Sequence, residues 1–216
     1  MKVIFGVPFK KNGKQKDYQY VFAGKTWNAD TFKPKYNMKP IMSQYMFYYF
    51  GYEENSPIDL VDLLNKQGVI LNVGSSSNVT SMFRYSNFNH VPAIDTRSAS
   101  SLQYLFADSN IETIDELILK DNGTQTFDST FYLCSKLKNI TISGVFANNI
   151  GLTYCSALSK TSVTSIISAL SNTATGKLIK FNKGRIYTLF SDDGVNLNDE
   201  WWTLVNSKSN WDIQLA

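Results

Sequence analysis

One histidine is the residue of this chain best suited to acid–base chemistry. His90 is the only histidine among 216 residues, so any histidine-dependent catalytic triad must use it. It stands in Asn89-His90-Val91-Pro92, which reads as a strand, and the chain contains no Gly-x-Ser-x-Gly nucleophile motif. We therefore expect a histidine on a strand face and no catalytic triad.

Acidic pairs are the second candidate for chemistry: Glu53-Glu54, Asp115-Glu116, Asp192-Asp193 and Asp199-Glu200. Neighbouring side chains of a strand point to opposite faces, so the two members of such a pair do not converge. A glycosidase site needs two carboxyl groups that face each other across the substrate, and these pairs do not predict one. An enzyme acting on surface glycans stays open only if the C-terminal part holds an acidic cleft.

Oxygen and sulfur ligands do not predict a metal site. Residues 192–199 are rich in Asp and Asn but lack the ligand order of a calcium-binding loop, so we expect a turn and a helix cap. Cys134 and Cys155 have no neighbouring His or second Cys. They are expected to be buried thiols, with a disulfide as the open alternative. The sequence thus predicts no catalytic, metal or cofactor site.

A short sequence motif that recurs in the middle of the chain predicts the elements that position these residues. The four copies of the motif are Tyr85-Ser86-Asn87-Phe88, Asp108-Ser109-Asn110-Ile111, Cys134-Ser135-Lys136-Leu137 and Cys155-Ser156-Ala157-Leu158. Their serines are 23, 26 and 21 residues apart. Self-similarity at this period is typical of a leucine-rich-repeat solenoid. We expect Phe83, Phe106 and Phe131, which precede three of the serines, to lie in one column.

Such stacked strands would present a row of side chains to solvent. If Val91, Ile114 and Ile140 point inward, their neighbours point outward. The predicted ligand- or partner-binding residues are therefore His90, Pro92, Thr113, Asp115, Asn139 and Thr141. Small polar side chains in rows suit a sugar or a protein surface, and an inert face is the open alternative.

The first forty residues are strongly basic. They hold nine Lys and two Asp, a net charge of +7, whereas residues 41–216 carry −4, which together give +3. We expect a β-hairpin with an Asn-Gly turn and a returning strand over 18–22, attached to an acidic partner through Lys10, Lys11, Lys14 and Lys16. Solvated lysines are the alternative. Nucleic acid is not the expected partner, because the motif context of a DNA-binding module is missing.

The last part of the chain changes its periodicity. Residues 161–170 show helical spacing of apolar side chains, with Ser159 or Thr161 as the cap. A strand is predicted over 177–181, a second helix from near Asn198 and a final strand over 211–215. Together they predict an α/β cap.

Two stretches resemble a known family. Residues 81–96 and 130–140 resemble the BspA-like branch of leucine-rich repeats, found in gut and oral bacterial surface proteins and in phage virion proteins. The tail from Leu158 to Leu215 resembles the cap of phage-encoded members, so the likeness covers roughly residues 79–216. Residues 1–75 match nothing in this family. The resemblance and the sequence patterns together predict an α/β fold made of a short solenoid over 41–159, a basic β-rich segment over 1–40 and an α/β cap over 160–216.

The resemblance also implies a non-enzymatic role. We expect a structural or binding component of a phage virion, a tail or head fibre, that is made in the host cytoplasm and is oligomeric within an assembly. Its partners would be other virion proteins and a host surface protein or glycan. No apolar run is long enough for a transmembrane helix, and no signal peptide is expected. A bacterial surface or interaction protein is the alternative.

Overall fold

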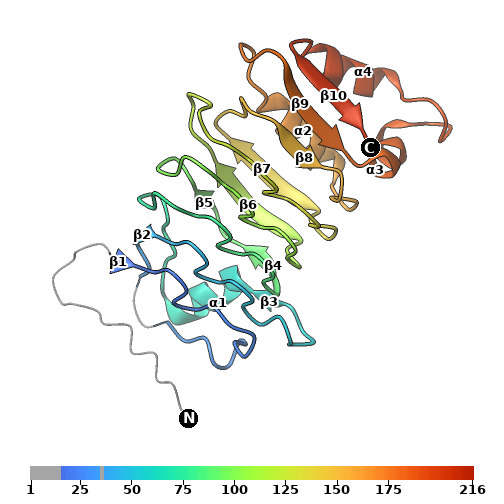
Figure 1. Ribbon diagram of the computed structural model, residues 1–216. Coiled ribbons are helices and arrows are strands. Elements are labelled where there is room, and N and C mark those ends of the chain that lie inside the picture. The colour runs from blue at the N-terminus through green and yellow to red at the C-terminus, as the bar shows by residue number, and fades with distance from the viewer. Residues whose placement is uncertain (1–15, 35–36) are drawn as a thin grey trace.

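Short parallel strands run side by side along the molecule. The computed structural model describes residues 16–34 and 37–216. Figure 1 shows the strands in succession from β1 at one end to β10 at the other. Their bounds are β1 Lys16–Asp17, β2 Pro40–Met42, β3 Ile58–Asp59, β4 Phe88–Val91, β5 Ile94–Asp95, β6 Thr113–Ile118, β7 Asn139–Ser143, β8 Ile150–Leu152, β9 Lys177–Phe181 and β10 Trp211–Leu215.

The strands belong to three parallel sheets within the described residues. One pairs β1 with β2, one has the order β10-β9-β8, and the largest has the order β3-β4-β6-β5 with β7 also on β6. Both β4 and β5 pair with β6, and the break between them falls at Pro92. Proline has no N–H to donate to a ladder, which explains the interruption.

Four helices lie in the described part of the chain: α1 Leu60–Gln67, α2 Lys160–Ser168, α3 Lys183–Phe190 and α4 Asp199–Asn206. Each begins after a polar N-cap that accepts a hydrogen bond from a backbone N–H three residues later. The expected caps Ser159 and Asn198 and the strands over 177–181 and 211–215 are confirmed. Helix α3 was not predicted from the sequence, although Asn182 is a regular cap signal.

The segments before β4, β6 and β7 share an unusual backbone. Residues four apart have left-handed φ, as in Ser81 and Tyr85 at 53° and 58° and in Tyr104 and Asp108 at 53° and 57°. These segments also bond to each other along the stack: the Phe83 N–H donates to the carbonyl of Leu105 at 2.9 Å. Side chains at equivalent positions are thereby brought into register.

Phenylalanine rings fill the interior at these positions. Phe47, Phe83, Phe106 and Phe131 form a stack with successive centroid distances of 5.4, 5.7 and 5.8 Å. All four side chains are buried. The expected column of Phe83, Phe106 and Phe131 is confirmed.

The predicted leucine-rich-repeat solenoid is wrong. The structure is a mixed α/β fold in which the parallel sheets form a half-barrel, so the α/β class holds while the repeat architecture does not. A leucine-rich repeat needs each unit to contribute a strand and a helix or 3₁₀ turn. Here the strands vary from two to six residues and fall into three sheets. The regular spacing of the sequence motifs aligned buried side chains but did not produce structural repeats of equal length.

The N-terminal part also differs from expectation. Residues 18–22, predicted as the returning strand of a hairpin, form turns, and the strand ends at Asp17. This strand pairs in parallel with β2, whereas a hairpin partner would be antiparallel. The predicted Asn-Gly turn and the attachment residues Lys10, Lys11 and Lys14 lie outside the described residues. Lys16 contributes its backbone to β1.

The two cysteines are buried free thiols, which confirms the simpler expectation. Burial raises the pKa of Cys134 to about 12 and raises that of Cys155 well above its usual value. Both are therefore protonated and unreactive at neutral pH. No helix in residues 16–34 and 37–216 has the length and apolar character needed to cross a bilayer.

Candidate ligand-binding face

Five of the six predicted binding residues lie on three adjacent parallel strands. His90 belongs to β4, Thr113 and Asp115 to β6, and Asn139 and Thr141 to β7. We call these five residues the polar face. The sixth, Pro92, is half-buried and follows the end of β4.

The alternation predicted for these strands is confirmed. Val91, Ile114 and Ile140 are aligned in register and buried. The neighbouring residues on the opposite face of the sheet are aligned as well: His90 is paired with Thr113, and Thr113 with Asn139. The Asn139 side-chain amide donates to Thr113 Oγ1 at 3.4 Å.

His90 is held between two carboxylates. Its Nε2 lies 2.7 Å from Asp115 Oδ1 and its Nδ1 lies 3.2 Å from Asp59 Oδ2. Burial lowers the pKa of His90, but the hydrogen bonds and charges of Asp115 and Asp59 outweigh burial, and the pKa is raised above its ordinary value. When the ring is protonated, both nitrogens donate to these carboxylates and form a cationic bridge; in every protonation state each nitrogen lies beside a carboxylate.

Asp59 was missing from the predicted site. It is the N-cap of α1, and its Oδ1 accepts a hydrogen bond from the Asp62 N–H at 2.8 Å. Its place before an apolar helical run signals a cap, but nothing in the sequence relates it to His90, 31 residues away. Two acids do converge here, therefore, from different strands and through a histidine.

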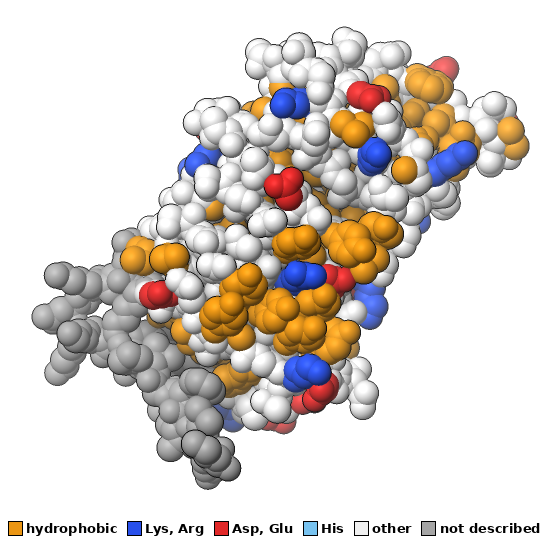
Figure 2. All heavy atoms as spheres, in the orientation of Figure 1, with side chains coloured by type: hydrophobic (Ala, Val, Ile, Leu, Met, Phe, Trp, Pro, Cys, Tyr) orange, Lys and Arg blue, Asp and Glu red, His pale blue; other side chains and the backbone are white. Residues whose placement is uncertain are grey.

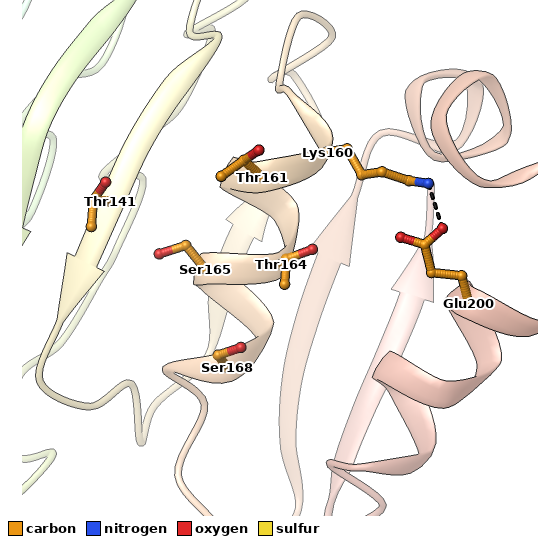
Figure 3. Close-up of a pocket in the computed structure, with 7 residues that line it drawn as sticks. All are labelled: Thr141, Lys160, Thr161, Thr164, Ser165, Ser168 and Glu200. Atoms are coloured by element: carbon orange, nitrogen blue, oxygen red, sulfur yellow. Dashed lines mark hydrogen bonds and ion pairs between the residues drawn. The ribbon is translucent and has the colours of Figure 1, made fainter.

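A shallow hollow continues the polar face beyond β7. Its volume is about 520 Å³, and Figure 3 shows Thr141 on β7, five residues on α2 and Glu200 on α4 around it. We call it the hydroxyl hollow; its lining is Thr141, Lys160, Thr161, Thr164, Ser165, Ser168 and Glu200. Lys160 and Glu200 form an ion pair at its rim, so the lining carries no net charge. Of these residues, only Thr141 was predicted from the sequence as a binding residue.

Helix α2 closes the edge of the largest sheet through serine hydroxyls. Ser162 Oγ accepts a hydrogen bond from the Ile140 N–H at 2.9 Å, and Ser165 Oγ accepts one from the Ile142 N–H at 2.9 Å. These two N–H groups belong to the outer edge of β7, where a further strand would otherwise supply carbonyls. The helix is therefore fixed to the sheet and holds Thr161 and Thr164 near Thr141.

The remaining acidic loop behaves as a turn. Asp193 Oδ1 accepts hydrogen bonds from the backbone N–H groups of Val195 and Asn196 at 2.8 and 2.7 Å, which lower the pKa of Asp193. The expectation of a turn and cap over 192–199 is confirmed. No cluster of three potential metal ligands occurs in the part of the chain that the structure describes.

Comparison of the chain with protein-family models, curated proteins and solved structures found no significant match. The resemblance to BspA-like proteins stays a prediction from the quoted residues.

Proposed function

We propose that this protein is a non-enzymatic binding component and that the polar face with the hydroxyl hollow is its ligand-binding surface. The main support for the proposal is that the polar face and the hydroxyl hollow adjoin each other and share Thr141. Strand residues aligned by parallel pairing lead directly to an open hollow whose polar groups are mainly hydroxyls. His90 is fully engaged by carboxylates, so the face supplies hydrogen bonds and shape rather than a reactive group.

A glycan is the ligand class that this surface fits. Serine and threonine hydroxyls both donate and accept hydrogen bonds, as sugar hydroxyls do. The Lys160–Glu200 pair offers one further donor and acceptor without net charge.

The exterior of a phage virion is the assembly that we propose for it, with the host surface as the source of the glycan. The support for this step is the sequence resemblance of the tail from Leu158 to Leu215 to the cap of phage-encoded BspA-like proteins. Mass spectrometry of purified particles tests it directly. Presence in particles at a constant ratio to other virion proteins supports the step. Absence from particles, with the protein found on or in bacterial cells, supports the alternative of a bacterial surface or interaction protein.

Threonine-to-valine substitutions test the binding face. Val keeps the shape of Thr but cannot form its hydrogen bonds, so Thr161→Val with Thr164→Val should weaken binding of host-surface oligosaccharides on a glycan array at least about tenfold, equivalent to roughly 1.4 kcal/mol. Thr203→Val, at an exposed position on α4 outside the hollow, is the matched control and should bind as the wild type does.

Two outcomes would count against the proposal. Equal loss of binding in the control and the hollow variants would show that the hollow is not the site. Shortened oligosaccharides after prolonged incubation, detected by mass spectrometry, would show that the protein is an enzyme.

A further inference from the structure

A second surface, formed by tyrosines, lies on the turn segments that precede the strands. We call it the tyrosine face; it consists of Tyr20, Tyr45, Tyr48, Tyr49, Tyr52, Tyr85 and Tyr104 together with Lys25, Glu53, Arg84 and Asp108. Several of its residues have left-handed φ, including Tyr45, Tyr49 and Tyr85 at 55°, 57° and 58°. Such a backbone is costly for a large L-residue. The strained turns therefore hold bulky aromatic side chains at the surface.

The ring faces of the central tyrosines are occupied within the molecule. Tyr49 and Tyr85 stack at 4.4 Å, and Lys25 lies 5.6 Å from the centroid of Tyr49. The Arg84 guanidinium lies 4.7 Å from the centroid of Tyr85 and 4.5 Å from that of Tyr104. A sugar or a nucleic-acid base binds tyrosine by stacking on a ring face, and these faces are already covered.

The charges of the tyrosine face are balanced. Lys25 pairs with Glu53 at 3.0 Å and Arg84 pairs with Asp108 at 3.3 Å. A polyanion such as nucleic acid would meet no excess of positive charge here.

The outer part of this surface is open to solvent. Tyr20 is 54% exposed and Tyr52 is 46% exposed, the latter in edge-on contact with Tyr49 and Tyr85. Figure 2 shows orange side chains, which include tyrosine, gathered with blue and red ones among them in the part of the molecule nearer the N-terminal strands. Tyrosine and arginine together are typical of the energetic centres of protein–protein interfaces.

We propose that the tyrosine face is a self-association interface that binds the same face of a second copy of this chain. A two-fold interface requires a surface that complements itself. A patch whose two ion pairs, Lys25–Glu53 and Arg84–Asp108, are each neutral meets this requirement, because two copies then meet without an excess of like charge. Tyrosine supplies contact area with few rotatable bonds, so little side-chain entropy is lost on association.

Sedimentation velocity of the full chain tests the interface. We expect the mass to rise with protein concentration from 24.4 kDa toward twice that value. Tyr20→Ser combined with Tyr52→Ser should weaken association at least about tenfold, because exposed aromatic anchors are removed from a desolvated contact. Val195→Ser, which changes a 70% exposed apolar side chain between α3 and α4, should leave association unchanged.

A charge-swap experiment identifies a second copy as the occupant. Lys25→Glu makes the Lys25–Glu53 position acidic on every copy, and Glu53→Lys makes it basic on every copy. Each variant alone should be monomeric because like charges face each other. An equimolar mixture of the two should regain wild-type association as a mixed dimer, since opposite charges then meet.

Three results would overturn the proposal: a wild-type protein that stays monomeric up to its solubility limit, association that persists in the double tyrosine variant, or a charge-swap mixture that stays monomeric. Circular dichroism of each variant must match the wild type, and a double tyrosine variant that does not is replaced by the single substitutions Tyr20→Ser and Tyr52→Ser, each of which removes one exposed ring. Glycan binding by the hydroxyl hollow is measured separately on the monomeric variants, so either idea can fail without the other.

Discussion

At the scale of the residue, His90 links three parts of the chain through one ring. It lies on β4, Asp115 lies on β6, and Asp59 caps α1. The bridge therefore ties the first turn of a helix to the largest sheet. Because it depends on the charge of the ring, its strength varies with pH.

The stability of the protein should fall as pH rises through the pKa of folded His90. The folded pKa is raised above the ordinary 6.5, so the stabilisation is fully present below about pH 6.5 and is lost at higher pH. We expect the difference in free energy of unfolding between the wild type and His90→Gln to be larger at about pH 5.5 than at about pH 8.5. Urea titrations at the two pH values measure it. A difference that is the same at both would contradict the cationic bridge.

Ser162→Ala should destabilise the protein by about 1–3 kcal/mol, because the buried Ile140 N–H would lose its acceptor. The Ser162 hydroxyl also donates to the Lys138 carbonyl at 3.0 Å and lies 2.9 Å from Ser159 Oγ, so one substitution removes three contacts. Ser168→Ala, at an exposed position of the same helix, is the control and should be neutral or slightly stabilising. Thermal and urea unfolding measure both, and equal stability of the two variants would mean that the helix does not close the sheet edge.

At the scale of the element, parallel pairing and helix caps explain most of the observed boundaries. The spacing in 161–170 and the cap at Ser159 predicted α2, and the alternation in 211–215 predicted β10. Helix α3 was missed because Gly184 and Thr188 weaken its periodicity. Residues 18–22 looked like a strand but form turns whose N–H groups bond to the segment around Met46. These contacts with a distant segment, which the local sequence does not reveal, favour turns over a strand for residues 18–22.

The turn at Gly144 is the element most sensitive to a side chain. Its φ is +86°, and a Cβ there would lie 2.3 Å from the Leu119 carbonyl oxygen. Gly144→Ala should cost at least about 1–2 kcal/mol from the left-handed backbone, and more from this overlap. Gly176→Ala, with φ +63° and no atom within 4 Å, isolates the backbone cost. The free energy of unfolding should be highest for the wild type, lower for Gly176→Ala and lowest for Gly144→Ala. Equal values for the two variants would show that the overlap relaxes.

At the scale of the whole molecule, one hydrophobic core runs from Tyr18 to Trp211. The column of Phe47, Phe83, Phe106 and Phe131 lies within it, and Trp201 packs against Phe181 and Phe190 toward the C-terminus. The predicted boundaries near residues 40 and 159 are crossed by this core. We therefore expect the described residues to unfold together.

Tryptophan fluorescence can test this cooperativity from both ends. Trp27 packs near Phe22 and Phe32, whereas Trp201, Trp202 and Trp211 lie in the C-terminal part. Variants that keep only Trp27 or only Trp201 should give the same urea midpoint as far-UV circular dichroism. Separate midpoints would instead support independent N-terminal and C-terminal units.

Phe106→Ala should lower the stability of the whole molecule by about 3–5 kcal/mol, because it removes a ring between Phe83 and Phe131 and leaves a cavity. Both fluorescence reporters should record the same loss. Tyr132→Ala, at a side chain 40% exposed, is the control and should cost much less. A loss seen by only one reporter would show that the column does not join the two ends.

Much of this architecture could be read from the order of the amino acids. The alternation around Val91, Ile114 and Ile140 identified which side chains are buried and which form the polar face, because strand geometry is local. The recurring aromatic positions located the Phe83–Phe106–Phe131 column, and polar residues before apolar runs located two helix caps. These features depend on periodicity and on short-range hydrogen bonds.

Other features depended on contacts between distant segments. The number and pairing of the strands, the convergence of Asp59 and Asp115 on His90, and the hydroxyl hollow between β7, α2 and α4 arise only when the chain is folded. The predicted solenoid was wrong for the same reason: similar spacing along the chain brings similar side chains together but does not set how the backbone strands divide into sheets. That division follows from which N–H and C=O groups find partners across the whole molecule.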